Sequence, residues 1–118
     1  MLSRSRKWFC VLGLSLWLAL LVVDANAQSE AWAAGEARLT SGDAEGAYRE
    51  LLQLEERFAG TPEFDYLLGL AALESGRPDA ATFAFERALT VDPNFFGARL
   101  DMARAYYALQ SGSRARRI

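Results

Sequence analysis

Residues 67–81 read LLGLAALESGRPDAA, and this stretch decides the fold. It has the apolar spacing of a helix, yet Gly69 lies inside it, where a glycine costs about 1 kcal/mol relative to alanine. Gly76 is a natural end for that helix, because glycine accepts the left-handed conformation. Pro78 then suits the first turn of a second helix. The stretch predicts two helices joined by a tight turn and leaves the reason for Gly69 open.

A regular repeat runs through the chain, with a period of about 34 residues. Gly35, Gly69 and Ala103 follow one another at this period. The same spacing joins Gly42 to Gly76, Ala47 to Ala81, Leu51 to Phe85 and Leu54 to Ala88, and it recurs in the series Ala34, Leu68, Met102 and Trp32, Tyr66, Leu100. So many compatible pairs on one period indicate a repeated two-helix unit.

Local signals set the predicted helix boundaries. In the middle unit Thr61 can cap the first helix, and Asn94 can cap the helix that follows Pro93. The first unit is a looser copy, with helices predicted over residues 31–41 and 44–57 and Asp43 as a cap between them. The third unit has one predicted helix, over residues 95–110.

On these residues the chain resembles a tetratricopeptide repeat protein, whose units are helix–turn–helix pairs of this length. The matching residues are Leu68, Gly69, Ala81, Phe85, Ala88 and Pro93 in the middle unit, Ala34, Gly35, Gly42, Asp43 and Ala47 in the first, and Met102, Ala103 and Tyr106 in the third. One departure is Asp65 or its neighbour Tyr66, which stands where the family usually has an aromatic residue ahead of the leucine.

The resemblance implies an all-α fold, an α-solenoid of about two and a half repeats after a signal peptide. Its expected parts are a degenerate repeat 1 over residues 28–61, repeat 2 over residues 62–95 and a partial repeat 3 with a basic tail over residues 96–118. It also implies a purpose for the small residues, since paired helices approach closely only where small side chains meet. We expect Gly69 to contact Ala81, and Gly35 to contact Ala47.

Residues 1–27 have the layout of a secretory signal peptide. Arg4, Arg6 and Lys7 form a basic start. Residues 8–23 are uncharged and mostly apolar, and Ala25 and Ala27 are the small residues that a signal peptidase reads. The apolar run is shorter than the about 20 residues that span a bilayer as a helix. We therefore expect cleavage after Ala27 (residues 1–27 being the signal peptide) and export, to the periplasm.

In the family, the first helix of each unit lines a concave groove that binds peptides. The resemblance implies that the groove residues here are Trp32, Glu36 and Leu39, then Tyr66, Leu70 and Leu73, and then Leu100, Arg104 and Tyr107, with Glu63, Glu74 and Asp101 beside them. Trp32, Tyr66 and Leu100 share one register, and such a stripe suits a hydrophobic or extended peptide. The alternative is that the stripe is core, which is the commoner role of an apolar stripe at helical spacing.

Composition and charge exclude several function classes. The chain of 118 residues has a net charge of −2, no histidine and one cysteine, Cys10, which lies in the predicted signal peptide. Residues 28–118 carry 10 arginines, no lysine and 14 acidic residues, a poor surface for nucleic acid. Without histidine there is no Ser-His-Asp triad and no histidine zinc site. We expect no enzyme, cofactor, metal or small-molecule substrate, and a protein or peptide as partner.

Three hypotheses remain open. The first is an exported scaffold, or adaptor, that binds another envelope protein through its concave face. The second is a truncated N-terminal repeat region of a larger outer-membrane or secretion-system protein, such as one with a β-barrel, since residues 95–112 look like the repeat that precedes such a barrel. The third is self-association through the unpaired helix of the third repeat. Arg114, Arg116 and Arg117 are either a basic tail for acidic partners or, as we favour, the start of an unfinished second helix.

Overall fold

The structure is a computed structural model of the chain, and it describes residues 26–117. The chain divides into two compact units, Met1–Ala31 and Trp32–Ile118, and the second holds the repeats. The predicted signal peptide falls outside the described residues except for its last two positions.

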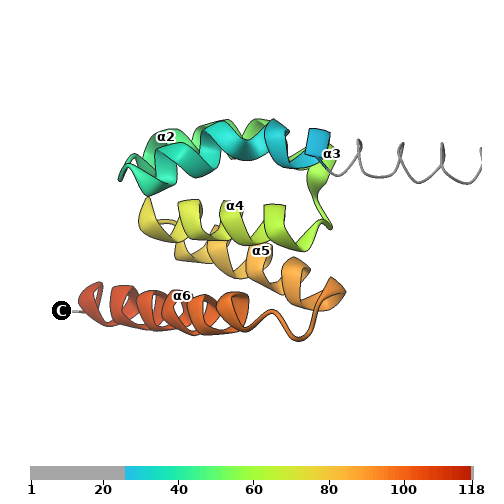
Figure 1. The fold of residues 1–118 in the computed structure, drawn as a ribbon. Coiled ribbons are helices and arrows are strands. Elements are labelled where there is room, and N and C mark those ends of the chain that lie inside the picture. The colour runs from blue at the N-terminus through green and yellow to red at the C-terminus, as the bar shows by residue number, and fades with distance from the viewer. Residues whose placement is uncertain (1–25, 118) are drawn as a thin grey trace, which may run out of the picture. The chain divides into compact units, whose positions relative to one another are not determined.

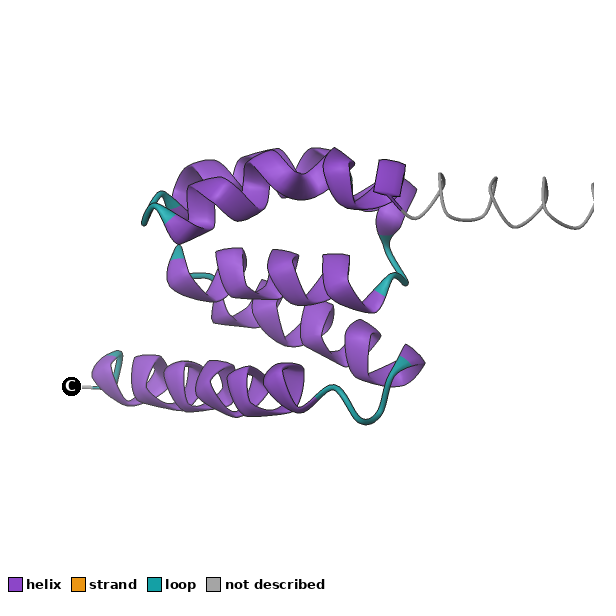
Figure 2. Cartoon of the chain, viewed as in Figure 1, coloured by secondary structure: helices purple, strands orange, loops and turns teal. Residues whose placement is uncertain are grey.

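Residues 26–40 are helical, and five further helices follow within the described range (Figures 1 and 2). These are α2 (Ala44–Gln53), α3 (Glu55–Phe58), α4 (Pro62–Glu74), α5 (Pro78–Val91) and α6 (Phe96–Ala115). Within residues 26–117 every regular element is a helix. The predicted all-α helical-repeat solenoid is therefore confirmed.

The helices of the second unit pack in chain order. α2 packs against α4, α4 against α5, and α5 against α6, so that α6 ends the stack in Figure 1. Two clusters of apolar side chains fill the space between them. Trp32, Phe58 and Phe64 form an aromatic cluster with ring centroids 5.2–5.7 Å apart. The second cluster is made of alanines around one ring: Ala72, Ala81, Phe85, Ala88, Ala98 and Ala105, all fully buried.

The turns follow the predicted signals in most places. Gly42 and Gly76 have φ values of +90° and +83°, the left-handed region that glycine tolerates. Asp43 caps α2, since its carboxylate accepts a 2.9 Å hydrogen bond from the Gly46 amide. Thr61 occupies the N-cap position of α4, although its hydroxyl makes no capping bond. The prediction for Asn94 is wrong by one residue, because Phe95 takes the N-cap position of α6.

Two predicted helix boundaries are corrected. The helix predicted over residues 44–57 is broken at Leu54, whose carbonyl accepts from both the Arg57 and the Phe58 amides at 3.1 and 3.2 Å. This tightened turn leads into α3, where Phe58 is buried. The arginine tail is not the start of a second helix, because α6 continues past Gly112 to Ala115 and includes Arg114 in its last turn.

The paired helices approach each other closely at Gly69 and Gly35, but the nearest side chains are not those of the predicted partners Ala81 and Ala47. A Cβ atom at Gly69 would lie 2.5 Å from Cε1 of Phe85, and a Cβ atom at Gly35 would lie 2.7 Å from Cγ of Leu51. Ala81 and Ala47 are buried nearby, yet the large side chains one helical turn later are the ones that fill the space above each glycine. Phe85 and Leu51 occupy the same position in the repeat period.

We predict that Gly69→Ala destabilises the fold by about 1–3 kcal/mol through overpacking against the Phe85 ring. Alanine has the better helix propensity, by about 1 kcal/mol, so propensity alone predicts the opposite sign. Gly112→Ala is the matched control, because Gly112 lies in α6 with nothing within 4 Å of its Cβ position. Urea unfolding followed by circular dichroism measures both variants, and equal stability of the two would contradict the packing described here.

Candidate functional site

One face of the stack carries two adjoining depressions. Leu39, Gly42, Ala44, Leu70 and Glu74 line the first, between the first and second repeats. Leu73, Glu74, Leu100, Ala103, Arg104, Tyr107 and Ala108 line the second, between α4 and α6. Glu74 belongs to both, so the two form one shallow groove across the first helices of the three repeats. We call this surface the groove.

Six of the predicted site residues line the groove: Leu39, Leu70, Leu73, Leu100, Arg104 and Tyr107. The three leucines from the first two repeats are half-buried, so they form its floor. Leu100 and Tyr107, both on α6, are 68% and 74% exposed. Large apolar side chains with that much exposure next to a half-buried apolar floor are the usual composition of a protein-binding surface.

Three of the predicted residues are placed elsewhere. Trp32 is a core residue, only 7% exposed, because Phe58 and Phe64 enclose its ring; its assignment to the groove is wrong. Glu36 is exposed but lines neither depression. Tyr66 is half-buried, with its ring 4.8 Å from that of Phe95. The expected stripe of Trp32, Tyr66 and Leu100 therefore runs from core to surface and is not a continuous binding strip.

A chain of hydrogen bonds joins α4 to α6 beside the groove. The Tyr66 hydroxyl donates to Oδ2 of Asp101 at 2.7 Å, and Arg104 donates to Oδ1 of the same carboxylate at 2.7 Å. Arg104 also reaches Glu74 at 2.9 Å. Asp101 is 7% exposed, and these two donors satisfy it. Because Glu74 and Arg104 are already paired, the groove offers a partner mainly apolar surface with a neutralised polar edge.

Burial raises the pKa of the Tyr66 phenol to about 12, and the hydrogen bond and negative charge of Asp101 add to the effect. Tyr66 therefore remains a protonated donor at neutral pH and holds Asp101 in place. Its role here is to fix α6 against α4. Gly97 makes this contact close, since a Cβ atom there would lie 3.2 Å from the Tyr66 oxygen.

Sequence reasoning missed three small residues of the groove, Gly42, Ala44 and Ala108. Ala103 was expected only as a repeat-defining residue, yet it is exposed and lines the groove. The prediction of groove residues relied on large side chains, so it did not identify small residues. The position of Gly42 in the turn after Leu39 was the available signal, because turns between paired helices lie at the edge of such a surface.

Asp65 has a structural role in a partly buried ion network that links α4 to α3 and α5. It is fully buried, accepts from the Gly60 amide at 2.8 Å and pairs with Arg87 at 2.9 Å. Arg87 also pairs with Glu55 of α3 at 2.6 Å. Burial raises the pKa of Asp65, while the Gly60 amide and Arg87 act in the opposite direction.

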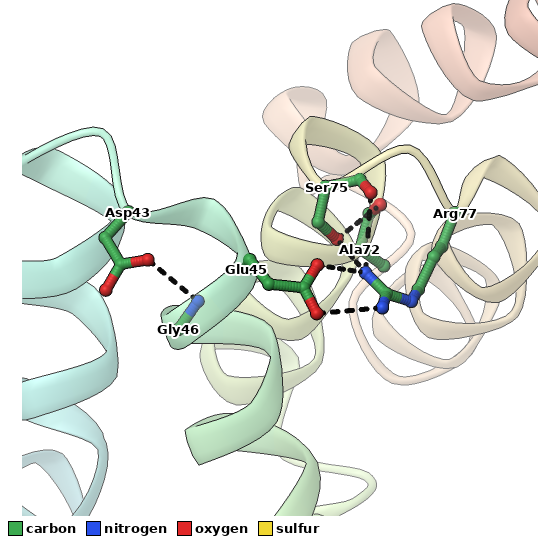
Figure 3. A network of polar contacts seen from close by, with 6 residues as sticks. All are labelled: Asp43, Glu45, Gly46, Ala72, Ser75 and Arg77. Carbon is green, nitrogen blue, oxygen red and sulfur yellow. Dashed lines mark hydrogen bonds and ion pairs between the residues drawn. The ribbon is translucent and has the colours of Figure 1, made fainter.

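Arg77 ties the first repeat to the second. Its guanidinium makes two bonds to the carboxylate of Glu45, at 2.8 and 3.0 Å, and one of 2.8 Å to the Ser75 hydroxyl (Figure 3). It also lies 4.5 Å from the centre of the Tyr48 ring. Planar two-point pairing of this kind fixes orientation. Within residues 26–117 the charged clusters thus hold helices together, and no group of side chains in that range is arranged to bind a metal ion.

Comparison with known families agrees with this geometry. Residues 72–118 match the tetratricopeptide repeat family model. The match begins near the end of α4 and covers all of α5 and α6. A search of curated protein sequences found no match.

Tetratricopeptide repeats generally mediate protein–protein interaction and are typically not enzymatic. Separately, none of the helices in the described part of the chain is both long and apolar enough to span a membrane.

We predict that Tyr66→Phe reduces the loss of stability at alkaline pH. In the folded state the phenol keeps its proton up to about pH 12, whereas in the unfolded chain it titrates near pH 10. The contribution of the Tyr66 phenol to the free energy of unfolding is therefore fully present below pH 10 and is lost as the pH rises through 12. Urea unfolding at pH 9 and pH 11 measures the difference, with the exposed Tyr107→Phe as control. The account is contradicted if both variants show the same pH dependence.

Proposed function

We propose that the chain is an exported interaction scaffold of the periplasm that binds a segment of another envelope protein in the groove. The observation that carries this proposal is the exposure of Leu100 and Tyr107 beside the half-buried Leu39, Leu70 and Leu73. The family match supports the class of activity, since repeats of this family generally bind proteins.

The groove favours an extended, mainly apolar segment. It is shallow and spans three repeats, which suits a strand-like or loop segment with alternating apolar side chains. The charged groups that line it, Glu74 and Arg104, already neutralise each other. Outside the C-terminal arginines the described chain is acidic, so basic residues flanking the apolar segment in a partner favour association.

Export is supported by the sequence of residues 1–27, with its basic start, apolar run and small residues at the cleavage position. Absence of cysteine from residues 28–118 suits an oxidising compartment, where stray disulfides otherwise form. The second candidate, the repeat region of a larger outer-membrane or secretion-system protein, is favoured by the exposed outer side of α6. In that case the groove recruits partners to the larger protein.

To test the groove, two variants are expressed in the native cells. One carries a photo-crosslinking amino acid in place of Tyr107, and the other carries it in place of Phe83. Phe83 is the matched control, because it is a similarly exposed aromatic (67%) on α5 and does not line the groove. We expect a discrete adduct from position 107 that weakens by about tenfold when Leu73→Ser is added. Adducts of equal yield from both positions would falsify the groove assignment.

To test export, the intact mass of the protein recovered from the cell envelope is measured. We expect the mass of a chain that begins at Gln28, because cleavage follows Ala27. An untrimmed N-terminus contradicts export by a cleaved signal peptide. A mass far above that of residues 28–118 supports the second candidate over a stand-alone scaffold.

A further inference from the structure

The guanidinium of Arg104 is held at the groove from two helices. Its terminal nitrogens donate to Oδ1 of Asp101 on α6 at 2.7 Å and to Oε1 of Glu74 on α4 at 2.9 Å. The Arg104 side chain is nevertheless 53% exposed and lines the groove. Because the N–H groups of a guanidinium lie in its plane, these two bonds fix its orientation and leave its flat faces without a partner.

Three apolar side chains line the same depression as Arg104. Leu100 and Tyr107 lie one turn before it and one turn after it on α6, at spacings that share one face of a helix. Leu73 of α4 is half-buried and completes the surround. This part of the groove is therefore an apolar depression with a fixed cation in its wall. A group that fills it has to be apolar and has to gain from a nearby positive charge.

The chain already contains one example of this chemistry. Arg77 makes two bonds to the carboxylate of Glu45 (Figure 3), and its guanidinium carbon lies 4.5 Å from the centre of the Tyr48 ring. An arginine of this fold can thus lie over an aromatic ring and keep its ion pair. Arg104 is also paired with carboxylates, but the arginines that lie over rings within residues 26–117 are three others.

Charge separates an aromatic occupant from an acidic one. Asp101 and Glu74 supply two negative charges beside the single positive charge of Arg104. A carboxylate from a partner is repelled by these two acids, and it finds the terminal nitrogens of Arg104 already bonded. A neutral aromatic ring needs no hydrogen-bond donor, because the negative face of the ring is attracted directly to the cation.

We propose that the segment bound in the groove places an aromatic side chain between α4 and α6, with its ring stacked on the guanidinium of Arg104. This inference rests on the function proposed above and names the anchor residue of the partner. Leu73, Leu100 and Tyr107 contact the remainder of the ring. Arg104 selects an aromatic side chain over an aliphatic one of the same size.

The test compares two peptides on the purified chain. One is a short alanine peptide with blocked ends and a central phenylalanine, and the other has cyclohexylalanine in its place. The two side chains have nearly the same size, but cyclohexylalanine lacks the π system and is more apolar. Binding is followed by heteronuclear NMR titration. We expect the phenylalanine peptide to bind about twofold to fivefold more tightly and to move the Arg104 Nε–H signal upfield, because the ring lies over it.

Arg104→Gln removes the cation, and we expect the preference for phenylalanine to disappear in this variant. Arg38→Gln is the matched control, because Arg38 is also paired with two carboxylates, those of Asp43 and Glu50, and its side chain is 52% exposed. Arg38 lines a depression outside the groove, so we expect its replacement to leave the preference unchanged. The comparison on the unmodified chain stands even if Arg104→Gln fails to fold.

Equal or tighter binding of the cyclohexylalanine peptide to the unmodified chain overturns the proposal, since the depression then selects apolar size alone. Absence of saturable binding by the phenylalanine peptide, or binding without a shift of the Arg104 Nε–H signal, also overturns it. A third peptide with a central aspartate tests the acidic occupant, and tighter binding of that peptide has the same consequence. Crosslinking from position 107 in cells is independent of these results, so failure of this proposal is distinguishable from failure of the groove itself.

Discussion

The contact between Gly69 and the ring of Phe85 is the constraint on which the rest of the structure depends. A helix pair can approach this closely only where one partner lacks a side chain, because a Cβ atom at Gly69 would lie 2.5 Å from the ring. The free energy that glycine costs in a helix is offset by burial of a whole aromatic side chain among five alanines. The same contact between Gly35 and Leu51 repeats the geometry one period earlier.

This repeated contact determines where the groove lies. Because each second helix lies over the glycine of its first helix, the opposite sides of the first helices face outward together and form the groove. Because the described chain has no helix over Ala103, the corresponding side of α6 is open. The hydrogen bonds from Tyr66 and Arg104 to Asp101 then fix α6 in place without a covering helix. The groove is thus a consequence of this packing rule.

Much of this could be predicted from the sequence because the period is regular. The repeat spacing predicted the helix pairs and the glycine turns, and the resemblance to the repeat family implied six of the groove residues. It could not say which residue lies over Gly69, since Ala81 and Phe85 share one face of α5 and only the helix separation decides between them. It also misplaced Trp32, because burial of that ring depends on Phe58, which the break at Leu54 brings inward.

Nuclear Overhauser measurements on the methylene protons of Gly69 test the packing most directly. The account predicts strong cross-peaks between the Gly69 Hα protons and the ring protons of Phe85, with an upfield shift of those Hα protons where they face the ring. The absence of cross-peaks between the Gly69 Hα protons and the Phe85 ring would contradict it.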